Sequence, residues 1–119
     1  MYRFVLVAAA ALAACSQSEN DRPLTLAYIT EAILAPSCSQ YTCHSSYRVA
    51  KGYAFDTVEA AQRSLSPPGV VNPLDAKSSL LYVVLTRNVK RMPYDSPLAQ
   101  KDIDLILEWI DAGAPGLTP

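Results

Sequence analysis

The sequence predicts a small all-α domain, and two features of the chain support this fold class. Proline is costly inside a helix, and the nine prolines leave proline-free stretches between them. Within these stretches apolar residues recur at the three- and four-residue spacing of a helix. No stretch shows the sustained alternation that would indicate a sheet. We therefore expect about four short helices joined by long, proline-marked connections.

Residues 1–14 predict a lipoprotein signal peptide that lies outside the fold. Arg3 supplies a positive charge, and residues 4–14 ("FVLVAAAALAA") form an apolar run shorter than the ~20 residues of a membrane span. The run ends at Cys15, and "LAAC" resembles a bacterial lipobox, in which the cysteine is lipidated. Ser16 in place of an aspartate implies, by the same resemblance, sorting to the outer membrane. An ordinary signal peptide cleaved near this position is the alternative.

The remainder of the chain predicts a lipidated Cys15 with a polar tether at residues 15–23, followed by one domain at residues 24–119. Ten Lys and Arg stand against eleven Asp and Glu, so the charge balance gives no nucleic-acid footprint. A domain of this size has a modest core. A bulky apolar cofactor could therefore fill much of its centre.

The first two expected helices flank the cysteine-containing segment. Residues 25–34 place Leu26, Ile29 and Ile33 on one face, and this helix is expected to end before Pro36. A short helix over residues 57–65 follows, with Asp56 as its expected N-cap.

The last two expected helices lie in the C-terminal half. Residues 78–86 ("SSLLYVVLT") are apolar enough for a strand, but Leu81, Val84 and Leu85 share a helical face. The final helix is expected to start at Ser96 and Pro97 and to end before Gly113. Its apolar stripe is Ile103, Ile106, Leu107 and Ile110, flanked by Trp109.

Residues 37–45 ("SCSQYTCHS") hold two cysteines and the only histidine of the chain. A zinc site would lack a fourth ligand, and adjacent Cys43 and His44 cannot easily bind one tetrahedral metal. A thioredoxin-like redox pair has two residues between its cysteines and a βαβ setting, whereas four residues separate Cys38 from Cys43. A Cys38–Cys43 disulfide remains open, and closing this small loop would stabilise the fold by roughly 2 kcal/mol.

Covalent attachment of a c-type haem is the fourth interpretation of this segment. In such sites two thiols bond to the porphyrin, and the histidine after the second cysteine ligates the iron. Cys43 and His44 keep that adjacency, although the usual motif has two residues between the cysteines.

Met92 is the candidate for the opposite axial ligand. It is the only methionine besides the initiator, and it lies between two basic residues and Pro93. A core methionine normally lies within an apolar periodic segment, which this loop is not. A methionine thioether is a common axial ligand of electron-transfer haem. An exposed loop methionine is the alternative.

Taken in order, the motifs resemble a known family. A helix leading into "APSC…CH", an "RMP" loop and a closing "DIDLILEWIDAGAP" resemble the small class I type of c-type cytochrome domain. The likeness is strongest to haem-binding domains of bacterial lipoproteins of myxobacterial or planctomycete style, and it covers residues 24–115. The resemblance implies covalent haem c on Cys38 and Cys43, with His44 and Met92 as axial ligands. It also implies that the first and last helices pack together, through Ile29, Ile33, Ile106 and Ile110.

The expected function is therefore that of a lipid-anchored monohaem cytochrome c, a one-electron carrier at the periplasmic face of the outer membrane. The expected apolar wall of the haem site consists of Tyr53, Phe55, Leu80, Leu81 and Val84. Basic residues cluster near the assigned ligands and would suit an acidic redox partner: Arg48, Lys51, Arg87, Lys90 and Arg91. The alternative is that one or two of them pair with the haem propionates and the rest are solvated surface.

Two alternatives belong to other functional classes. One is a haem-free lipoprotein of the same fold, with a Cys38–Cys43 disulfide, that acts as a binding or structural module. The other is a small haem peroxidase in which Met92 is not a ligand. The sequence offers no acid–base pair, which favours a carrier over a catalyst.

Overall fold

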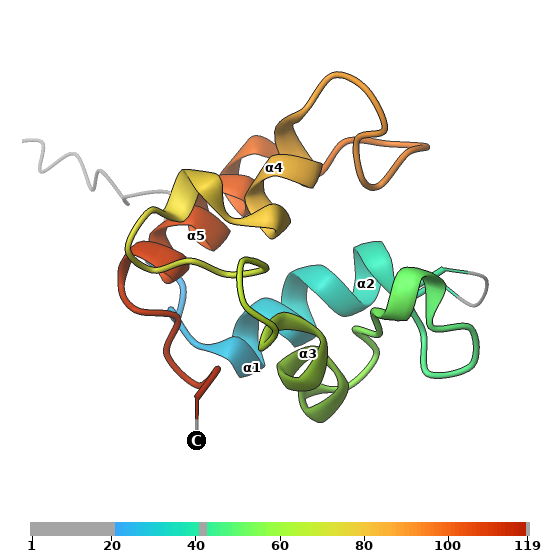
Figure 1. Cartoon of the computed structure of the whole chain (residues 1–119), viewed down its shortest axis with the longest axis horizontal. Helices are drawn as coiled ribbons and strands as arrows, with labels where there is room; N and C mark the ends of the chain where they lie inside the picture. Colours follow the sequence, from blue (N-terminus) through green and yellow to red (C-terminus); the bar gives the residue numbers. More distant parts are fainter. Residues whose placement is uncertain (1–20, 41–42, 119) are drawn as a thin grey trace, which may run out of the picture.

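Helices account for all regular secondary structure in the part of the chain that the structure describes (Figure 1). The computed structural model describes residues 21–40 and 43–118, so the expected signal peptide and Cys15 lie outside the described residues. The described residues form four helical segments and two short 3₁₀ turns, η2 (Ala50–Gly52) and η3 (Ala76–Ser78), with no strand. The all-α fold class is confirmed. None of these helices is long and apolar enough to cross a bilayer.

The first helical segment is longer than expected. α1 (Leu26–Ile29), the π-helical turn η1 (Thr30–Leu34) and α2 (Ala35–Cys38) follow one another without a break. Thr25 caps the start, since its hydroxyl accepts a hydrogen bond from the N–H of Tyr28 at 3.2 Å. The helix was expected to end before Pro36, and that expectation is wrong. The wider π turn directly before Pro36 gives its ring the room that a regular helix would deny it.

α3 (Val58–Leu65) and α4 (Leu80–Thr86) form the middle of the chain. Thr57, not Asp56, caps α3, because its hydroxyl accepts from the N–H of Ala60 at 3.1 Å. The carboxylate of Asp56 instead accepts hydrogen bonds from Ser46. The apolar segment before the Met92 loop is helical as expected, and η3 leads into it.

α5 (Gln100–Asp111) begins later than expected. Ser96 and Pro97 precede it in an irregular segment, and Ala99 occupies the N-cap without a side-chain hydrogen bond. The expected end is confirmed, since Gly113 follows the helix with a φ of +94°, a left-handed conformation that suits glycine. Leu107 is only partly buried, whereas Leu105 and Trp109 are fully buried beside the predicted stripe.

One apolar cluster joins the two ends of the domain. Ile29 and Ile33 of the first helix and Ile106 and Ile110 of α5 all belong to it. Beyond α5 the chain returns to α1 (Figure 1), where the carbonyl of Pro115 accepts from the N–H of Leu26 at 2.9 Å and from Nε1 of Trp109 at 3.1 Å. These two hydrogen bonds fasten the C-terminal segment to the start of the first helix and to α5.

Candidate functional site

The first helical segment delivers Cys38 directly into a tight turn. The N–H of His44 donates to the carbonyl of Cys38 at 3.1 Å, and the N–H of Cys43 donates to the carbonyl of Gln40 at 2.8 Å. Tyr41 and Thr42, inside the turn, lie outside the described residues. The structure therefore brings together three of the four predicted site residues, and the longer helix is the reason that Cys38 has a fixed position.

Both thiols of this turn are half-buried and free. Burial raises the pKa of the Cys38 thiol to about 11, and the charge of a neighbouring Cys43 thiolate raises it further. At neutral pH Cys38 is a protonated thiol in an apolar setting.

The imidazole of His44 is held from one side. Its Nδ1 lies 3.3 Å from the carbonyl oxygen of Tyr53, and the N–H of Phe55 donates to the carbonyl of His44 at 2.7 Å. Because a carbonyl only accepts, Nδ1 carries the proton in this contact, which leaves the lone pair on Nε2. A histidine oriented through Nδ1 in this manner can bind a metal through Nε2.

Two aromatic rings pack around that imidazole. The rings of Tyr53 and Phe55 are stacked, with centroids 6.3 Å apart. Each meets the His44 ring edge-on, at centroid distances of 6.0 and 5.5 Å. Phe55 is buried and Tyr53 is half-buried. Two of the five members of the expected apolar wall, Tyr53 and Phe55, therefore contact the candidate ligand.

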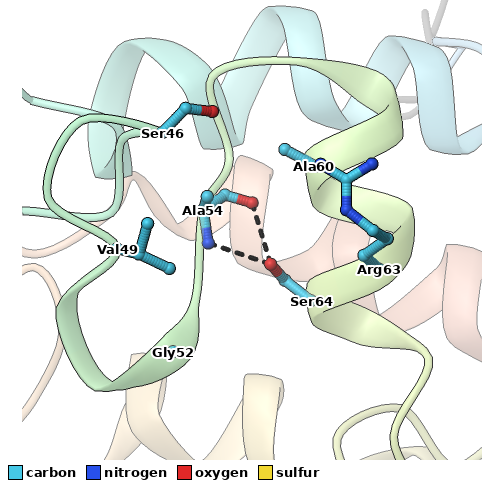
Figure 2. A pocket seen from close by; sticks show the side chains of 7 residues that line it. All are labelled: Ser46, Val49, Gly52, Ala54, Ala60, Arg63 and Ser64. Atoms are coloured by element: carbon cyan, nitrogen blue, oxygen red, sulfur yellow. Dashed lines mark hydrogen bonds between the residues drawn. The ribbon is translucent and has the colours of Figure 1, made fainter.

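Ser64 of α3 fixes the segment that carries these rings. Its hydroxyl accepts from the N–H of Ala54 at 2.9 Å and donates to the carbonyl of Ala54 at 3.0 Å (Figure 2). The sequence analysis did not identify Ser64, although a serine beside Ala61 and Leu65 on the buried face of a helix is a signal for such a contact. A pocket of about 330 Å³ lies between α3 and this segment, lined by Ser46, Val49, Gly52, Ala54, Ala60, Arg63 and Ser64 (Figure 2).

The Met92 loop is attached to α4. The N–H of Met92 donates to the carbonyl of Val84 at 2.7 Å, and the methionine is half-buried. Lys90, with a φ of +54°, reverses the chain just before it, and Nε of Arg87 donates to the carbonyl of Lys90 at 2.8 Å. These contacts place the loop independently of the cysteine turn.

A second pocket connects the Met92 loop with the cysteine helix. It has a volume of about 240 Å³ and is lined on one side by Ser37 and Gln40. The other side belongs to the loop and the start of α5, lined by Pro93, Asp95, Ser96, Pro97, Leu98, Ala99 and Asp102. The immediate neighbours of Cys38 and of Met92 thus face one cavity, although neither of these two side chains lines it.

Large apolar side chains are exposed on the segments that carry the candidate ligands. Leu81 is buried and Val84 half-buried as expected for a wall, but Leu80 is exposed. The exposed large apolar residues of these segments are Tyr47, Val49, Leu80, Val83, Val89 and Tyr94. Exposed apolar residues in this number on these segments indicate apolar surface that some other group can cover.

Within the described residues, no group of three or more His, Cys, Asp and Glu side chains is arranged to hold a metal ion.

Comparison of the chain with family models, with curated proteins and with solved structures found no match. The interpretation of the site therefore depends on its own chemistry.

Proposed function

We propose that this chain is a small monohaem c-type cytochrome that carries single electrons, with its first and last helices packed as in class I domains. The observation that carries the proposal is the turn of Cys38, Cys43 and His44. It presents two free thiols beside an imidazole whose Nε2 is left available by the Nδ1 contact to Tyr53. Cys38 and Cys43 would form the thioethers, and His44 and Met92 would be the axial ligands. Haem iron would supply the one-electron redox chemistry.

The donor set fits a haem better than a bare metal ion. Two thiols, one imidazole and one thioether match the attachment and axial groups of a c-type haem. A large apolar macrocycle would cover part of the apolar surface that the segments with the candidate ligands expose. The excess of basic over acidic residues near both ligands suits a cofactor with carboxylate groups.

The surrounding residues would perform three tasks. The carbonyl of Tyr53 orients His44, and Phe55 excludes water from the imidazole. The backbone contact between Met92 and Val84 positions the thioether. Ser64 holds the whole segment of Tyr53 and Phe55 against α3.

We further propose that lipidated Cys15 anchors the domain to the periplasmic face of the outer membrane. A polar tether before residue 24 would let the domain reach redox partner proteins. The exposed Arg48, Lys51 and Lys90 favour an acidic partner.

Covalent attachment is tested by expression in a periplasm that contains haem-maturation proteins. The denatured protein should retain haem through acid–acetone extraction and should give a c-type pyridine haemochrome spectrum. Cys38→Ser should yield a single-thioether spectrum, and His44→Ala should abolish the low-spin spectrum. Gln40→Ala, in the same turn, is the matched control and should keep the wild-type spectrum.

A wild-type protein with a Cys38–Cys43 disulfide and no haem, under conditions where a control cytochrome matures, would overturn the proposal. It would favour the haem-free binding module instead. Haem attachment together with strong peroxide reactivity would favour the peroxidase.

The assignment of Met92 has its own test. The oxidised wild-type protein should show the weak near-infrared band of methionine-to-iron charge transfer. Met92→Ala should remove this band, open the iron to imidazole and lower the midpoint potential, because a thioether favours ferrous iron. An unchanged spectrum in Met92→Ala would show that another group holds the sixth position.

A further inference from the structure

The pocket between α3 and the segment of residues 46–54 is a separate candidate for a binding site (Figure 2). None of the four candidate haem ligands lines it. Its volume of about 330 Å³ is at the low end of the ~300–1,000 Å³ range of small-molecule sites. The pocket is therefore large enough for a small ligand that is distinct from the proposed haem.

Among the described residues, Arg63 is the only charged one that lines this pocket. It lies in the last turn of α3, and Figure 2 shows its side chain extending along the helix towards Ala60. In the part of the chain that the structure describes, its guanidinium has no hydrogen bond or ion pair, whereas that of Arg22 pairs with Asp102. The donors of Arg63 are therefore free to bind a ligand.

The acids nearest to this arginine along the chain do not compete for it. The carboxylate of Asp56 accepts from the N–H and the hydroxyl of Ser46 at 3.0 and 2.8 Å. Glu59, one turn before Arg63 on α3, does not line the pocket, and no ion pair joins these two described residues. The charged residues of the segment 46–54 are both basic and exposed: Arg48 and Lys51. This charge balance favours an anionic ligand.

The two serine hydroxyls that line the pocket can accept hydrogen bonds. The hydroxyl of Ser64 donates to the carbonyl of Ala54 and accepts from its N–H, which leaves one of two lone pairs. The hydroxyl of Ser46 donates to Asp56, which leaves both of its lone pairs. Because both hydroxyl protons are already used, these groups suit a ligand that donates. The remaining side chains of the lining are small and apolar: Val49, Ala54 and Ala60.

We infer that this pocket binds a short organic hydroxy acid, whose carboxylate pairs with Arg63. A guanidinium binds a carboxylate through two parallel hydrogen bonds. The ligand hydroxyl would donate to Ser46 or Ser64, and the short carbon chain would contact the methyl groups of the lining. An amino group could also donate, but its positive charge would be repelled by the basic residues around the pocket. The inference does not depend on haem, because it uses no candidate haem ligand.

The test is an amide NMR titration of the purified protein with three probes. L-Lactate has both the carboxylate and the hydroxyl, propionate lacks only the hydroxyl, and inorganic phosphate lacks the carbon chain. The amide signals of Gly52 and Ala54 show whether a probe lies in the pocket, since both residues line it.

Three variants accompany the probes. Arg63→Gln removes the charge and the fork, and Arg63→Lys keeps the charge without the fork. Both change an exposed side chain and leave the core intact. Arg48→Gln is the matched control, because it removes an exposed positive charge from a residue of the segment 46–54 that does not line the pocket.

L-Lactate should shift the signals of Gly52 and Ala54 saturably. Propionate should bind about 2–10-fold more weakly, which corresponds to the loss of one hydrogen bond. Arg63→Gln should weaken lactate binding about tenfold or more, because a charge-assisted pair of hydrogen bonds is lost, and Arg63→Lys should weaken it less. Arg48→Gln should change the dissociation constant by less than about twofold, since salt screens an exposed charge.

Three results would each overturn the inference. The first is lactate that gives no saturable shift at Gly52 and Ala54. The second is an equal loss of lactate affinity in Arg63→Gln and Arg48→Gln, which would mean general attraction by basic residues. The third is phosphate that binds more tightly than lactate, which would assign the pocket to an inorganic anion.

Two features keep the test decisive. If Arg63→Gln does not fold, Arg63→Lys and the ratio of lactate to propionate affinity decide the outcome. The titration does not measure haem attachment, so its failure would leave the proposed function intact, and a protein without haem would leave this inference intact.

Discussion

Two regions of the domain differ in how far they bury their large apolar side chains: the helical core, and the segments that carry His44 and Met92. The first helix and α5 contribute side chains such as Ile29, Ile106 and Trp109, each 0% exposed, to one apolar cluster. The segments that carry His44 and Met92 leave Tyr47, Val89 and Tyr94 exposed to 72%, 73% and 80%. Both regions contain large apolar residues, and the second also buries Phe55 and Leu81, but only the second leaves several of them exposed.

The two regions are therefore stabilised in different ways. The helical core is stabilised by burial of apolar surface, worth about 25 cal/mol per Å². The ligand-bearing segments are held by individual contacts instead, such as His44 to Tyr53, Ser64 to Ala54 and Met92 to Val84. Such segments open more readily than a packed core, and a bound apolar group would complete them.

The largest effect should come from the core. Trp109→Ala removes a fully buried ring and should lower the free energy of unfolding by about 3–5 kcal/mol. Tyr94→Ala, which truncates an exposed aromatic side chain, should cost less than about 0.5 kcal/mol in the haem-free protein. Urea unfolding followed by far-UV circular dichroism measures both, because the Trp109 variant lacks the fluorescent indole.

Trp109→Phe serves as the control for packing. It keeps most of the ring but loses the hydrogen bond from Nε1 to Pro115, and its loss should lie between the two. Equal losses for Trp109→Ala and Tyr94→Ala would contradict the division into a packed core and an incomplete ligand region.

The second effect concerns the two hydrogen bonds between Ser64 of α3 and Ala54, which lies between Tyr53 and Phe55. Ser64→Ala leaves the buried N–H and carbonyl of Ala54 without their hydroxyl partner, which should cost about 1–3 kcal/mol. Hydrogen exchange at the Ala54 amide should accelerate more than exchange within α5. Ser66→Ala, whose exposed hydroxyl bonds only to the carbonyl of Gln62, is the matched control. Similar exchange rates in both variants would show that Ser64 does not hold the segment.

The fold was more predictable from the sequence than the site was. The spacing of apolar residues was sufficient to predict α3, α4 and α5, because a helix that buries one face needs apolar residues three and four positions apart. The continuation of the first helix through Pro36 was not predictable, since it depends on a π turn whose hydrogen bonds only the three-dimensional path reveals. The N-cap of α3 was predicted one residue too early because Asp56 and Thr57 are both residue types that favour this position. In the structure the Asp56 carboxylate accepts a hydrogen bond from the hydroxyl of Ser46 instead.

For the site, the sequence placed Cys38, Cys43 and His44 in one short segment, and the structure does bring them together. Tyr53 as the partner of His44 could not be derived, because its contribution is a backbone carbonyl, which every residue has. The sequence also could not tell which of the five basic residues near the candidate ligands are shielded from solvent, and the structure shows that only Arg87 and Arg91 are half-buried.

The third effect tests the charges around the ligand-bearing segments. In the haem-loaded form that the proposed function implies, changing Lys51 and Lys90 to glutamate together should slow oxidation by an anionic oxidant such as ferricyanide, most strongly at low salt. Exposed charges steer encounter in this manner and are screened beyond ~8–10 Å near physiological ionic strength. Stopped-flow rates against ionic strength should show a flatter slope, with the midpoint potential nearly unchanged.

The matched control is Lys77→Glu with Lys101→Glu, which changes the net charge equally at exposed sites in η3 and α5. The control should keep most of the wild-type slope. Identical slopes for the two double variants would mean that net charge, not the position of Lys51 and Lys90, governs the encounter.

The smallest effect concerns the exposed contact between Asp56 and the turn after His44. The carboxylate accepts from the N–H of Ser46 at 3.0 Å and from its hydroxyl at 2.8 Å, and these bonds lower the pKa of Asp56. A lowered pKa in the folded state means that the stabilisation is present above the unfolded pKa of ~3.9 and disappears as the pH falls through the folded value.

Asp56→Asn should therefore be less stable than wild type at pH 7, by less than about 1 kcal/mol because the carboxylate is exposed to solvent. The difference should shrink as the pH falls below ~4, where the wild-type carboxylate becomes protonated. Thermal unfolding at pH 7, 5 and 3 measures it, with Asp75→Asn as the control for net charge. A stability difference between Asp56→Asn and wild type that stays constant from pH 7 to pH 3 would show that the side chain acts through packing. The ionised carboxylate would then not be what holds Ser46 in place after His44.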